Sequence, residues 1–342
     1  MEFMTQITDF AQHWYGWSTL FVLGMGLLVV GGNLLVDGGV GVANKFKINT
    51  MVVGLTIIAF STSAPELAFN VLASINGHGE MSLGNIFGSN IANLSLVLGV
   101  GAIIYGQKVL KDGSLKLPKE YITAEHKGLK SFTAIVSVFT VVAFFFGKEN
   151  PLLGLTWPCA LLLLLMFAYF IIKMVLPSKK LVDIPDVKSS AKASICLLIV
   201  GLVFLGVGGK FAEISSVAAG RSFGLSEIFI GATIVAIATS LPELVTTIVA
   251  AKKGESDMAV GNVVGSNFFN MLFVLPITML VHPIPIPAGY EPWIYLVVML
   301  GITFVASTMM KNDKDLTSKE GYVLVGFYLM FLVGITIWKS VG

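Results

Sequence analysis

Charged residues are scarce in this sequence: only 12% of its 342 residues are Asp, Glu, Lys or Arg. So few charges cannot cover the surface of a soluble protein of this length, whereas 55% of the residues are hydrophobic and the mean hydropathy is +0.86. The composition therefore excludes a soluble globular domain and indicates a protein that crosses a membrane many times. Residues 1–17 contain no basic stretch and no small-residue cleavage site, so we expect no cleaved signal peptide.

Cysteine and histidine are also rare, with two and four residues respectively. Cys159 and Cys196 lie in apolar runs and are expected to pack as small core side chains, which argues against a disulfide or a thiolate metal site. The four histidines fall in expected loops or near the ends of apolar segments, where a solvated side chain is the ordinary role. They are His13, His78, His126 and His282. A metal that prefers sulfur or imidazole ligands is therefore poorly served.

Long apolar segments are what the sequence does contain. A helix needs roughly 20 apolar residues to cross the hydrocarbon of a membrane, and ten segments are candidate spans. Their ranges are 17–43, 50–75, 81–105, 132–146, 152–175, 193–219, 226–251, 258–280, 292–309 and 322–338. We therefore predict an all-α, polytopic membrane protein with ten transmembrane helices.

The distribution of basic residues predicts how these spans are oriented. Eighteen of the 22 Lys and Arg residues fall in or beside the loops after the first, third, fifth, seventh and ninth spans, and three fall on the opposite side. Because cytoplasmic loops carry the excess of basic residues, both termini are predicted to face away from the cytoplasm of an inner or plasma membrane. A wrong number of spans would have scrambled this asymmetry, which therefore supports ten.

Two carboxylates interrupt the apolar segments. Glu66 is the only ionisable residue of the second span, and Glu243 is the only one between residues 228 and 251. A carboxylate in mid-membrane costs about 2.5–3.5 kcal/mol, so we expect both to be functional. Each follows a proline, Pro65 or Pro242, which removes a backbone hydrogen bond and opens the helix. Non-helical backbone is tolerated at that depth only where it lines an enclosed cavity.

The two carboxylates belong to an internal repeat, because Glu243 follows Glu66 by 177 residues and the same offset aligns the flanking residues without a gap. It aligns Gly54 with Gly231, Thr56 with Thr233, Gly84-Asn85 with Gly261-Asn262, Gly88-Ser89-Asn90 with Gly265-Ser266-Asn267, and Asn93 with Asn270. Five spans separate the copies, so the second half must be inverted relative to the first. Inverted repeats bring their broken helices together at the middle of the bilayer. We therefore expect Glu66 and Glu243 to approach each other.

This repeat also predicts the domain organisation. Residues 1–176 form the first membrane repeat with spans one to five, residues 177–192 a cytoplasmic linker, and residues 193–342 the inverted second repeat with spans six to ten. The longest hydrophilic connections, 107–130 and 177–192, are too short for a soluble domain, so no regulatory module is expected.

Around each carboxylate the sequence places only oxygen donors. The first repeat offers Glu66, Thr62, Ser63, Ser89, Asn93 and the Ala59 carbonyl, which Pro65 is expected to expose; the second offers, in the same pattern, Glu243, Thr239, Ser240, Ser266, Asn270 and Ala236. Ca²⁺ takes about 6–8 oxygen ligands of these kinds. Two carboxylates balance one divalent cation, a small group of Na⁺ ions or two protons, and the exchange of these charges in one site is the physical basis of antiport.

The neutral donors have ordinary structural roles as well. Ser and Thr in a span often bond to a carbonyl one turn earlier, and Asn often bonds across a helix interface. For Ser63, Ser89, Ser240 and Ser266 both roles stay open. The two glutamates differ, because a carboxylate has no inexpensive structural role at that depth.

Two motifs surround each carboxylate. In the first copy they are Gly54-Leu-Thr followed by Ala59-Phe-Ser-Thr62-Ser63-Ala-Pro-Glu66-Leu, and then Gly84-Asn85-Ile-Phe-Gly88-Ser89-Asn90-Ile-Ala-Asn93; the second copy has Ala236-Ile-Ala-Thr239-Ser240-Leu-Pro-Glu243-Leu and Gly261-Asn-Val-Val-Gly265-Ser266-Asn267-Phe-Phe-Asn270. They resemble the α-repeats of the calcium/cation antiporter superfamily, most closely its sodium/calcium exchanger branch and the potassium-dependent relatives. Proton/calcium exchangers of that superfamily typically carry Gly-Asn before the Glu, where this chain has Thr-Ser, which favours Na⁺ over H⁺.

The resemblance implies electrogenic exchange of several Na⁺ for one Ca²⁺ by alternating access. It implies that Glu66 and Glu243 bind both ions and that Thr62 and Thr239 supply oxygens to Ca²⁺. It also implies that Asn93 and Asn270 complete the central site. The flanking Na⁺ sites would be lined by the Ala59 and Ala236 carbonyls and by Ser63, Ser89, Ser240 and Ser266. Some prokaryotic and potassium-dependent members have Asp in place of Asn270, so the loss of that charge argues against K⁺ cotransport.

Spans one and six carry glycine instead of such ligands. The glycines are Gly24, Gly26, Gly31, Gly32, Gly38, Gly39 and Gly41 in span one, then Gly201, Gly206, Gly208, Gly209 and Gly220 in span six. Small residues let helices approach closely, and the resemblance implies that this pair slides as the gate; static packing is the alternative. Asp37, Lys210 and Glu213 are expected at the membrane interface, where Lys210 and Glu213 are spaced to pair.

Other functions use the same residues in part. The fold and site would also serve Ca²⁺/H⁺ exchange, or transport of Mn²⁺ or Mg²⁺. An intramembrane hydrolase built on Glu66 and Glu243 is disfavoured, because the chain has no His-Glu-x-x-His and no Gly-x-Ser-x-Gly motif. A passive channel would need a continuous ring of ligands. We therefore predict an antiporter, not an enzyme, that binds Ca²⁺ and Na⁺ as substrates in a lipid bilayer, without a cofactor, a nucleic acid or an obligatory protein partner.

Overall fold

The structure is a computed structural model that describes residues 2–75, 77, 79–108, 114–116, 130–131, 133–138, 141, 155–178, 190–223, 235–284, 291–312 and 315–341. Most of these residues are helical. The first half contains α1 (Glu2–Ala11), α2 (Trp14–Phe46), α3 (Thr50–Val53), η1 (Gly54–Ile58), α4 (Ala59–Thr62), α5 (Ala64–Ile75), α6 (Gly79–Ala92), η2 (Asn93–Val97), α7 (Leu98–Lys108), β1 (Ser114–Lys116) and α9 (Trp157–Ser178). The second half contains α10 (Ala191–Ser222), α12 (Ala236–Thr239), α13 (Leu241–Lys253), α14 (Ser256–Phe269), η5 (Asn270–Val274), α15 (Leu275–Val281), α16 (Glu291–Asn312), β2 (Asp315–Thr317) and α17 (Ser318–Val341).

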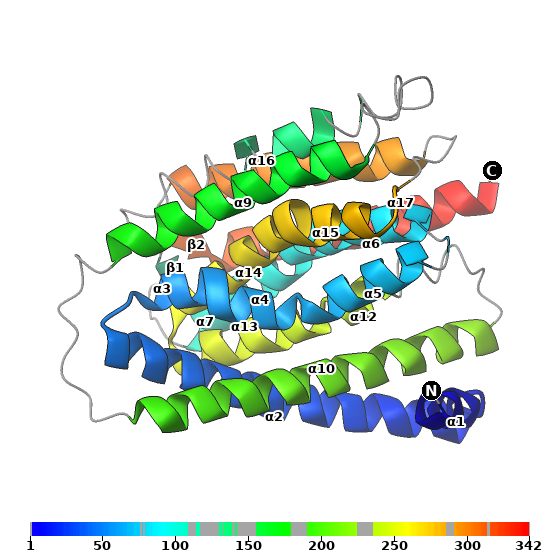
Figure 1. The fold of residues 1–342 in the computed structure, drawn as a ribbon, viewed down its shortest axis with the longest axis horizontal. Helices are drawn as coiled ribbons and strands as arrows, with labels where there is room; N and C mark the ends of the chain where they lie inside the picture. The colour runs from blue at the N-terminus through cyan, green and yellow to red at the C-terminus, as the bar shows by residue number, and fades with distance from the viewer. Residues whose placement is uncertain are drawn as a thin grey trace.

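The helices form one elongated bundle (Figure 1). The two longest, α2 and α10, lie side by side along one edge, and α9 and α16 lie along the opposite edge. The broken helices α3–α5 and α12–α13 lie between these edges, together with α6 and α14. The helix α1 and the C-terminal end of α17 lie at the same end of the bundle, as an even number of membrane crossings requires.

The predicted spans are recovered wherever the structure describes them. Six helices are long and apolar enough to cross a membrane, and a bent pair, Thr50–Thr62 with Ala64–Ile75, makes a seventh. The fifth predicted span begins later than expected, because its apolar helix starts at Trp157 and not at residue 152. Most of the fourth predicted span, 132–146, and the first residues of the seventh, 226–251, lie outside the described residues.

Contacts between loops agree with the predicted alternation of sides. The strands β1 and β2, which add a small non-helical element, pair antiparallel and join the loop after the third span to the loop after the ninth. A bridge between Leu155 and Ile284 joins the chain before the fifth span to the loop after the eighth. Each contact joins two loops that ten spans would place on the same side of the membrane.

Glycines form a close seam between α2 and α10. A Cβ atom added to Gly24 would lie 2.8 Å from the Gly208 carbonyl oxygen, and one added to Gly31 would lie 3.0 Å from that of Gly201. The offset of 177 residues maps Gly24 onto Gly201 and Gly31 onto Gly208, so the two contacts exchange under the repeat. Close helix approach was therefore predicted correctly, and the seam is symmetric about the inversion axis.

The seam continues inward to both helix breaks through one residue of α10. A Cβ atom at Gly209 would lie 3.3 Å from Cγ of Pro242 and 3.8 Å from Cγ of Pro65. The prolines of the two repeats therefore flank the same point on α10. A movement of α10 along its axis would therefore change its contacts at both breaks.

The predictions for polar and cysteine side chains on these helices were partly correct. Lys210 and Glu213 form the predicted ion pair, with 2.7 Å between Nζ and Oε1. Asp37 pairs with Lys253 at 2.7 Å, a partner that the sequence did not indicate. The prediction that both cysteines are core side chains is wrong for Cys196, which is exposed on the outer face of α10, where a small apolar group can contact lipid.

Substituting Gly31 with alanine tests the seam. The added methyl group would meet the Leu205 backbone nitrogen at 2.9 Å, so we expect a loss of about 1–3 kcal/mol in stability, as for other overpacked sites. Thermal unfolding in detergent measures it. Gly26→Ala is the matched control, because a Cβ atom at Gly26 meets nothing within 4 Å. Equal melting temperatures for the two variants would contradict the seam.

Candidate cation site

Both helices that carry the glutamates are broken where their prolines require. The helix α4 ends at Thr62, and Ser63 leaves the helix with φ −83° and ψ 3°. The second repeat has the same break, because α12 ends at Thr239 and Ser240 has φ −87° and ψ 2°. In the first repeat the two parts of the span meet at 42°. The opening of both helices that the prolines predict is therefore confirmed.

The expectation that Pro65 exposes the Ala59 carbonyl is wrong. The Ser63 N–H donates to that carbonyl at 2.9 Å, and the Thr62 hydroxyl lies 3.3 Å from it. Proline lacks the N–H that would bond four residues back, at residue 61, so its effect falls two residues later than expected. The Ala236 carbonyl is engaged in the same way, by the Ser240 N–H at 3.2 Å and the Thr239 hydroxyl at 3.3 Å.

The two repeats meet at the Glu243 carboxylate, which is fully buried. Its Oε1 accepts from the Ser63 hydroxyl of the first repeat at 3.2 Å and from the Ser266 hydroxyl of its own repeat at 3.3 Å. Glu66 follows Ser63 by about one helical turn, so this contact brings the two carboxylates toward each other. The approach of Glu66 and Glu243 that the inverted repeat predicts is therefore present.

Several buried oxygens around this pair are left without hydrogen bonds. Glu66 has no exposed surface, and neither of its carboxylate oxygens accepts a hydrogen bond from any residue that the structure describes. The same holds for Oε2 of Glu243, the Ser240 hydroxyl and the side-chain amides of Asn93 and Asn270. Buried polar groups are normally satisfied, so this many unpartnered polar atoms together mark the candidate cation site.

A change of helix type places the two asparagines. The helix becomes π-helical at Asn93, where η2 begins, and again at Asn270, where η5 begins. Such turns occur often at functional sites because they displace a side chain from the regular helical face. The sequence predicted both asparagines as ligands but did not predict this turn, which the Gly-x-x-x-x-Asn spacing alone does not reveal.

Two further asparagines, Asn85 and Asn262, contact the site and were not among the predicted ligands. Nδ2 of Asn85 donates to the Thr239 hydroxyl at 3.2 Å, and Oδ1 of Asn262 accepts from the Thr62 hydroxyl at 3.1 Å. Each contact joins one repeat to the other. The signal was present in the sequence, because both asparagines belong to the repeated Gly-Asn pairs at the offset of 177 residues.

The structure therefore gathers most of the predicted donors around two carboxylates. Ser266 and Ser89 each lie beside a threonine of the opposite repeat, Thr62 at 3.3 Å and Thr239 at 3.5 Å. Among the described residues, no group of three or more His, Cys, Asp or Glu side chains lies together. A cation here would rely on two carboxylates and on neutral oxygens, the mixture that suits hard cations.

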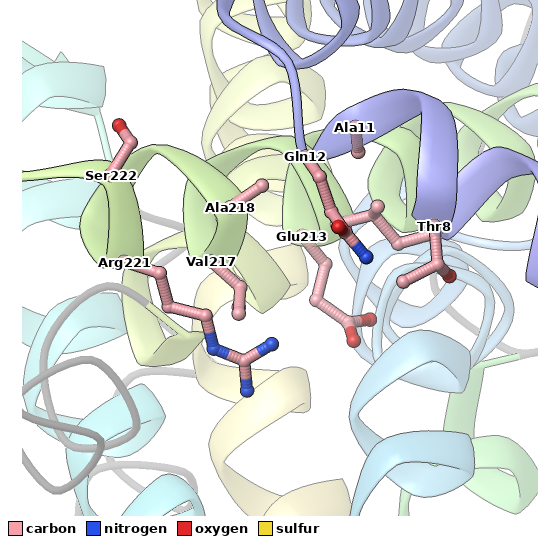
Figure 2. A pocket seen from close by; sticks show the side chains of 9 residues that line it. Thr8, Ala11, Gln12, Glu213, Val217, Ala218, Arg221 and Ser222 are labelled. Carbon is pink, nitrogen blue, oxygen red and sulfur yellow. The ribbon is translucent and has the colours of Figure 1, made fainter.

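A separate cavity of about 420 Å³ lies between α1 and the C-terminal part of α10 (Figure 2). Glu213, Arg221 and Gln12 are among its polar lining residues, and Glu213 is already paired with Lys210. None of the predicted cation ligands lines it. It is therefore distinct from the carboxylate site.

Comparison with known proteins identifies the family. The family model described as sodium/calcium exchanger protein matches residues 17–176 and 193–337. The sodium/calcium exchanger MaX1 of Methanosarcina acetivorans is 29% identical over 92% of this chain and 97% of its own length, and the inner membrane protein YrbG of Escherichia coli is 27% identical over 94% and 97%. A structure of the sodium-calcium exchanger NCX_Mj soaked with Na⁺ and Sr²⁺ matches with a TM-score of 0.77 at 26% identity, over 93% of this chain and 98% of that chain. The ten-span, inverted-repeat fold predicted from the sequence is thereby confirmed. The chain belongs to the sodium/calcium exchanger family of membrane cation antiporters and is a transporter, not an enzyme.

Proposed function

We propose that this protein exchanges Na⁺ for Ca²⁺ across the membrane by alternating access, with net movement of charge. One observation carries the proposal: the buried carboxylates Glu66 and Glu243 come from inverted repeats, and three of their four oxygens accept no hydrogen bond within the described part of the chain. A divalent cation would neutralise both charges and fill the vacant acceptor positions. Several Na⁺ ions would do the same in the competing state.

The proposed ligands are those that the sequence indicates. Glu66 and Glu243 would bind both ions, and neutral oxygens would complete the shells, from Thr62, Thr239, Asn93, Asn270, Ser63, Ser240, Ser89, Ser266 and the Ala59 and Ala236 carbonyls. Both carbonyls already accept a backbone N–H, and each has a threonine hydroxyl 3.3 Å away, so a cation would have to displace that hydroxyl to reach the second lone pair. Their contribution is therefore the smallest.

The choice of Na⁺ as counter-ion rests on the residues before the prolines. Thr62-Ser63 and Thr239-Ser240 supply neutral oxygens, and the relative MaX1 is named a sodium/calcium exchanger. The neutral Asn270 argues against added K⁺. Exchange of Ca²⁺ for protons is the alternative that the same carboxylates would support.

We also propose the domain boundaries and the orientation that follow from the sequence. The two repeats would be residues 1–176 and 193–342, joined on the cytoplasmic side by residues 177–192. Both termini would face away from the cytoplasm of an inner or plasma membrane, because most of the basic residues lie on the opposite side. The relative YrbG is named an inner membrane protein, which supports this location.

Transport in proteoliposomes tests the function. Liposomes loaded with Na⁺ should take up radioactive Ca²⁺ from a Na⁺-free medium, and an inside-positive potential should speed that uptake if more than two Na⁺ leave for each Ca²⁺. Liposomes without Na⁺ but with a pH gradient are the control. Uptake driven by the pH gradient alone would overturn the Na⁺ assignment and favour proton exchange.

Glu66→Gln and Glu243→Gln test the site. Each variant removes one of two charges that a bound divalent cation needs, and breaking one partner of a buried charge pair costs about 3–5 kcal/mol. We therefore expect Ca²⁺ affinity to fall roughly 100-fold or more, measured as the loss of Ca²⁺-dependent stabilisation against heat. Glu320→Gln is the matched control, because Glu320 only caps α17 through Thr317, which glutamine also does. Wild-type Ca²⁺ affinity in either site variant would refute the assignment.

Cysteine labelling tests the orientation. In a background with Cys159 and Cys196 replaced by serine, single cysteines at the exposed positions Trp14 and Phe46 mark the two ends of α2. We expect a membrane-impermeant maleimide to label Trp14→Cys in intact cells and Phe46→Cys only after permeabilisation. The reverse pattern would place both termini in the cytoplasm.

A further inference from the structure

The two asparagines that contact the site threonines are turned in opposite senses. Asn85 and Asn262 occupy equivalent positions of the repeat, and each contacts the threonine of the opposite half. Yet Asn85 presents its amide nitrogen to Thr239, whereas Asn262 presents its amide oxygen to Thr62. The pseudo-symmetry of the site is therefore broken at its two threonines.

The orientation of Asn262 is fixed by the second repeat. Its Nδ2 donates to the Glu243 backbone carbonyl at 3.3 Å and to the Thr247 hydroxyl at 3.0 Å. A carbonyl can only accept, so the nitrogen must face Glu243. The amide oxygen therefore faces Thr62, whose hydroxyl donates its hydrogen to it.

The orientation of Asn85 is fixed in the opposite sense by the first repeat. Asn70 occupies the position of Thr247, and its Nδ2 donates to the Glu66 backbone carbonyl at 2.7 Å and to Oδ1 of Asn85 at 2.9 Å. Ser82 holds Asn70 from the other side by donating to its Oδ1 at 2.8 Å. Because Asn70 donates to Asn85, the nitrogen of Asn85 is turned toward Thr239.

The two threonine oxygens are consequently unequal as cation ligands. Thr62 faces two pure acceptors, Oδ1 of Asn262 at 3.1 Å and the Ala59 carbonyl at 3.3 Å. Its third neighbour, the Ser266 hydroxyl at 3.3 Å, donates its hydrogen to Glu243, so none of the three takes a lone pair from the Thr62 oxygen. Thr239 accepts a hydrogen from Asn85, which occupies one lone pair and brings the positive edge of an amide beside the oxygen.

We propose that residues 70 and 247 are positioning residues that set the sense of these amides, so that Thr62 binds Ca²⁺ more strongly than Thr239. Ser82, which corresponds to Ala259 in the second repeat, supports the setting in the first. This assignment rests on the proposed function, since it concerns the same cation site. It adds that the two halves of the site are not equivalent and names the residues responsible.

Exchanging the residues between the repeats tests the assignment. In Thr247→Asn/Ala259→Ser the second repeat acquires the residues of the first, Asn262 turns its nitrogen toward Thr62, and Ca²⁺ binding should weaken about tenfold. In Asn70→Thr/Ser82→Ala the first repeat acquires the residues of the second, Asn85 turns its oxygen toward Thr239, and Ca²⁺ binding should strengthen. Ala259→Ser alone is the matched control and should leave binding unchanged.

The measurement is the Ca²⁺ concentration that gives half of the maximal thermal stabilisation of the full-length protein in Na⁺-free detergent solution. Damage to folding would lower the unfolding temperature without Ca²⁺ in both variants, but only turned amides would shift Ca²⁺ binding in opposite directions. Either variant alone tests the expected direction of its own shift. Unchanged binding, or shifts in the same direction, would overturn the assignment.

The same measurement separates this assignment from the proposed function. A wild-type protein that binds Ca²⁺ here but exchanges it for protons in liposomes would overturn the Na⁺ assignment, while the shifts in the variants would still support unequal threonines. A wild-type protein that Ca²⁺ does not stabilise would overturn both.

Discussion

Keeping two carboxylates in the apolar middle of a membrane is the constraint on which this structure depends. Each costs about 2.5–3.5 kcal/mol to place there, and neither Glu66 nor Glu243 has any exposed surface. Hydroxyls from both repeats offset part of this cost at Glu243. In the proposed function, a bound cation offsets the rest. The broken helices, the crossed hydrogen bonds and the inverted arrangement all serve to bring enough oxygens to one depth.

The cost also explains why the surrounding helices must fit closely. Water that reached the carboxylates from the side would remove the reason for a cation to bind there. The seam between α2 and α10 brings two backbones together at Gly24 and Gly208, and α10 lies against both prolines through Gly209. The same helix therefore covers the site and contacts the two points where its supporting helices are broken. Through that contact, the packing of α10 bears on the geometry of the proposed cation site.

Much of this arrangement was predictable because it depends on short sequence motifs and on the spacing between them. A proline followed by glutamate in an apolar run defines both breaks, and an ungapped offset defines the inversion that brings Glu66 to Glu243. Other features depend on which distant residues become neighbours in the folded chain, and local sequence does not give those contacts. The Ala59 carbonyl was misassigned because the Ser63 N–H still reaches it, whereas the N–H that Pro65 lacks would bond residue 61. The π-helical turns at Asn93 and Asn270 have no signal in the repeated motifs. The sense of the Asn85 amide depends on a residue fifteen positions earlier in another helix.

The difference between positions 70 and 247 separates this chain from a pair of identical halves. A half-length chain inserted in both orientations would make the same crossed contacts between two copies, but each copy would carry the same residue at this position. Both amides would then be turned alike, and the two threonines would be equal. Joining the halves in one polypeptide removes that equality. Asn70 and Thr247 can then differ, and the proposed ion site can have two unlike ends, which two identical halves related by exact symmetry cannot form.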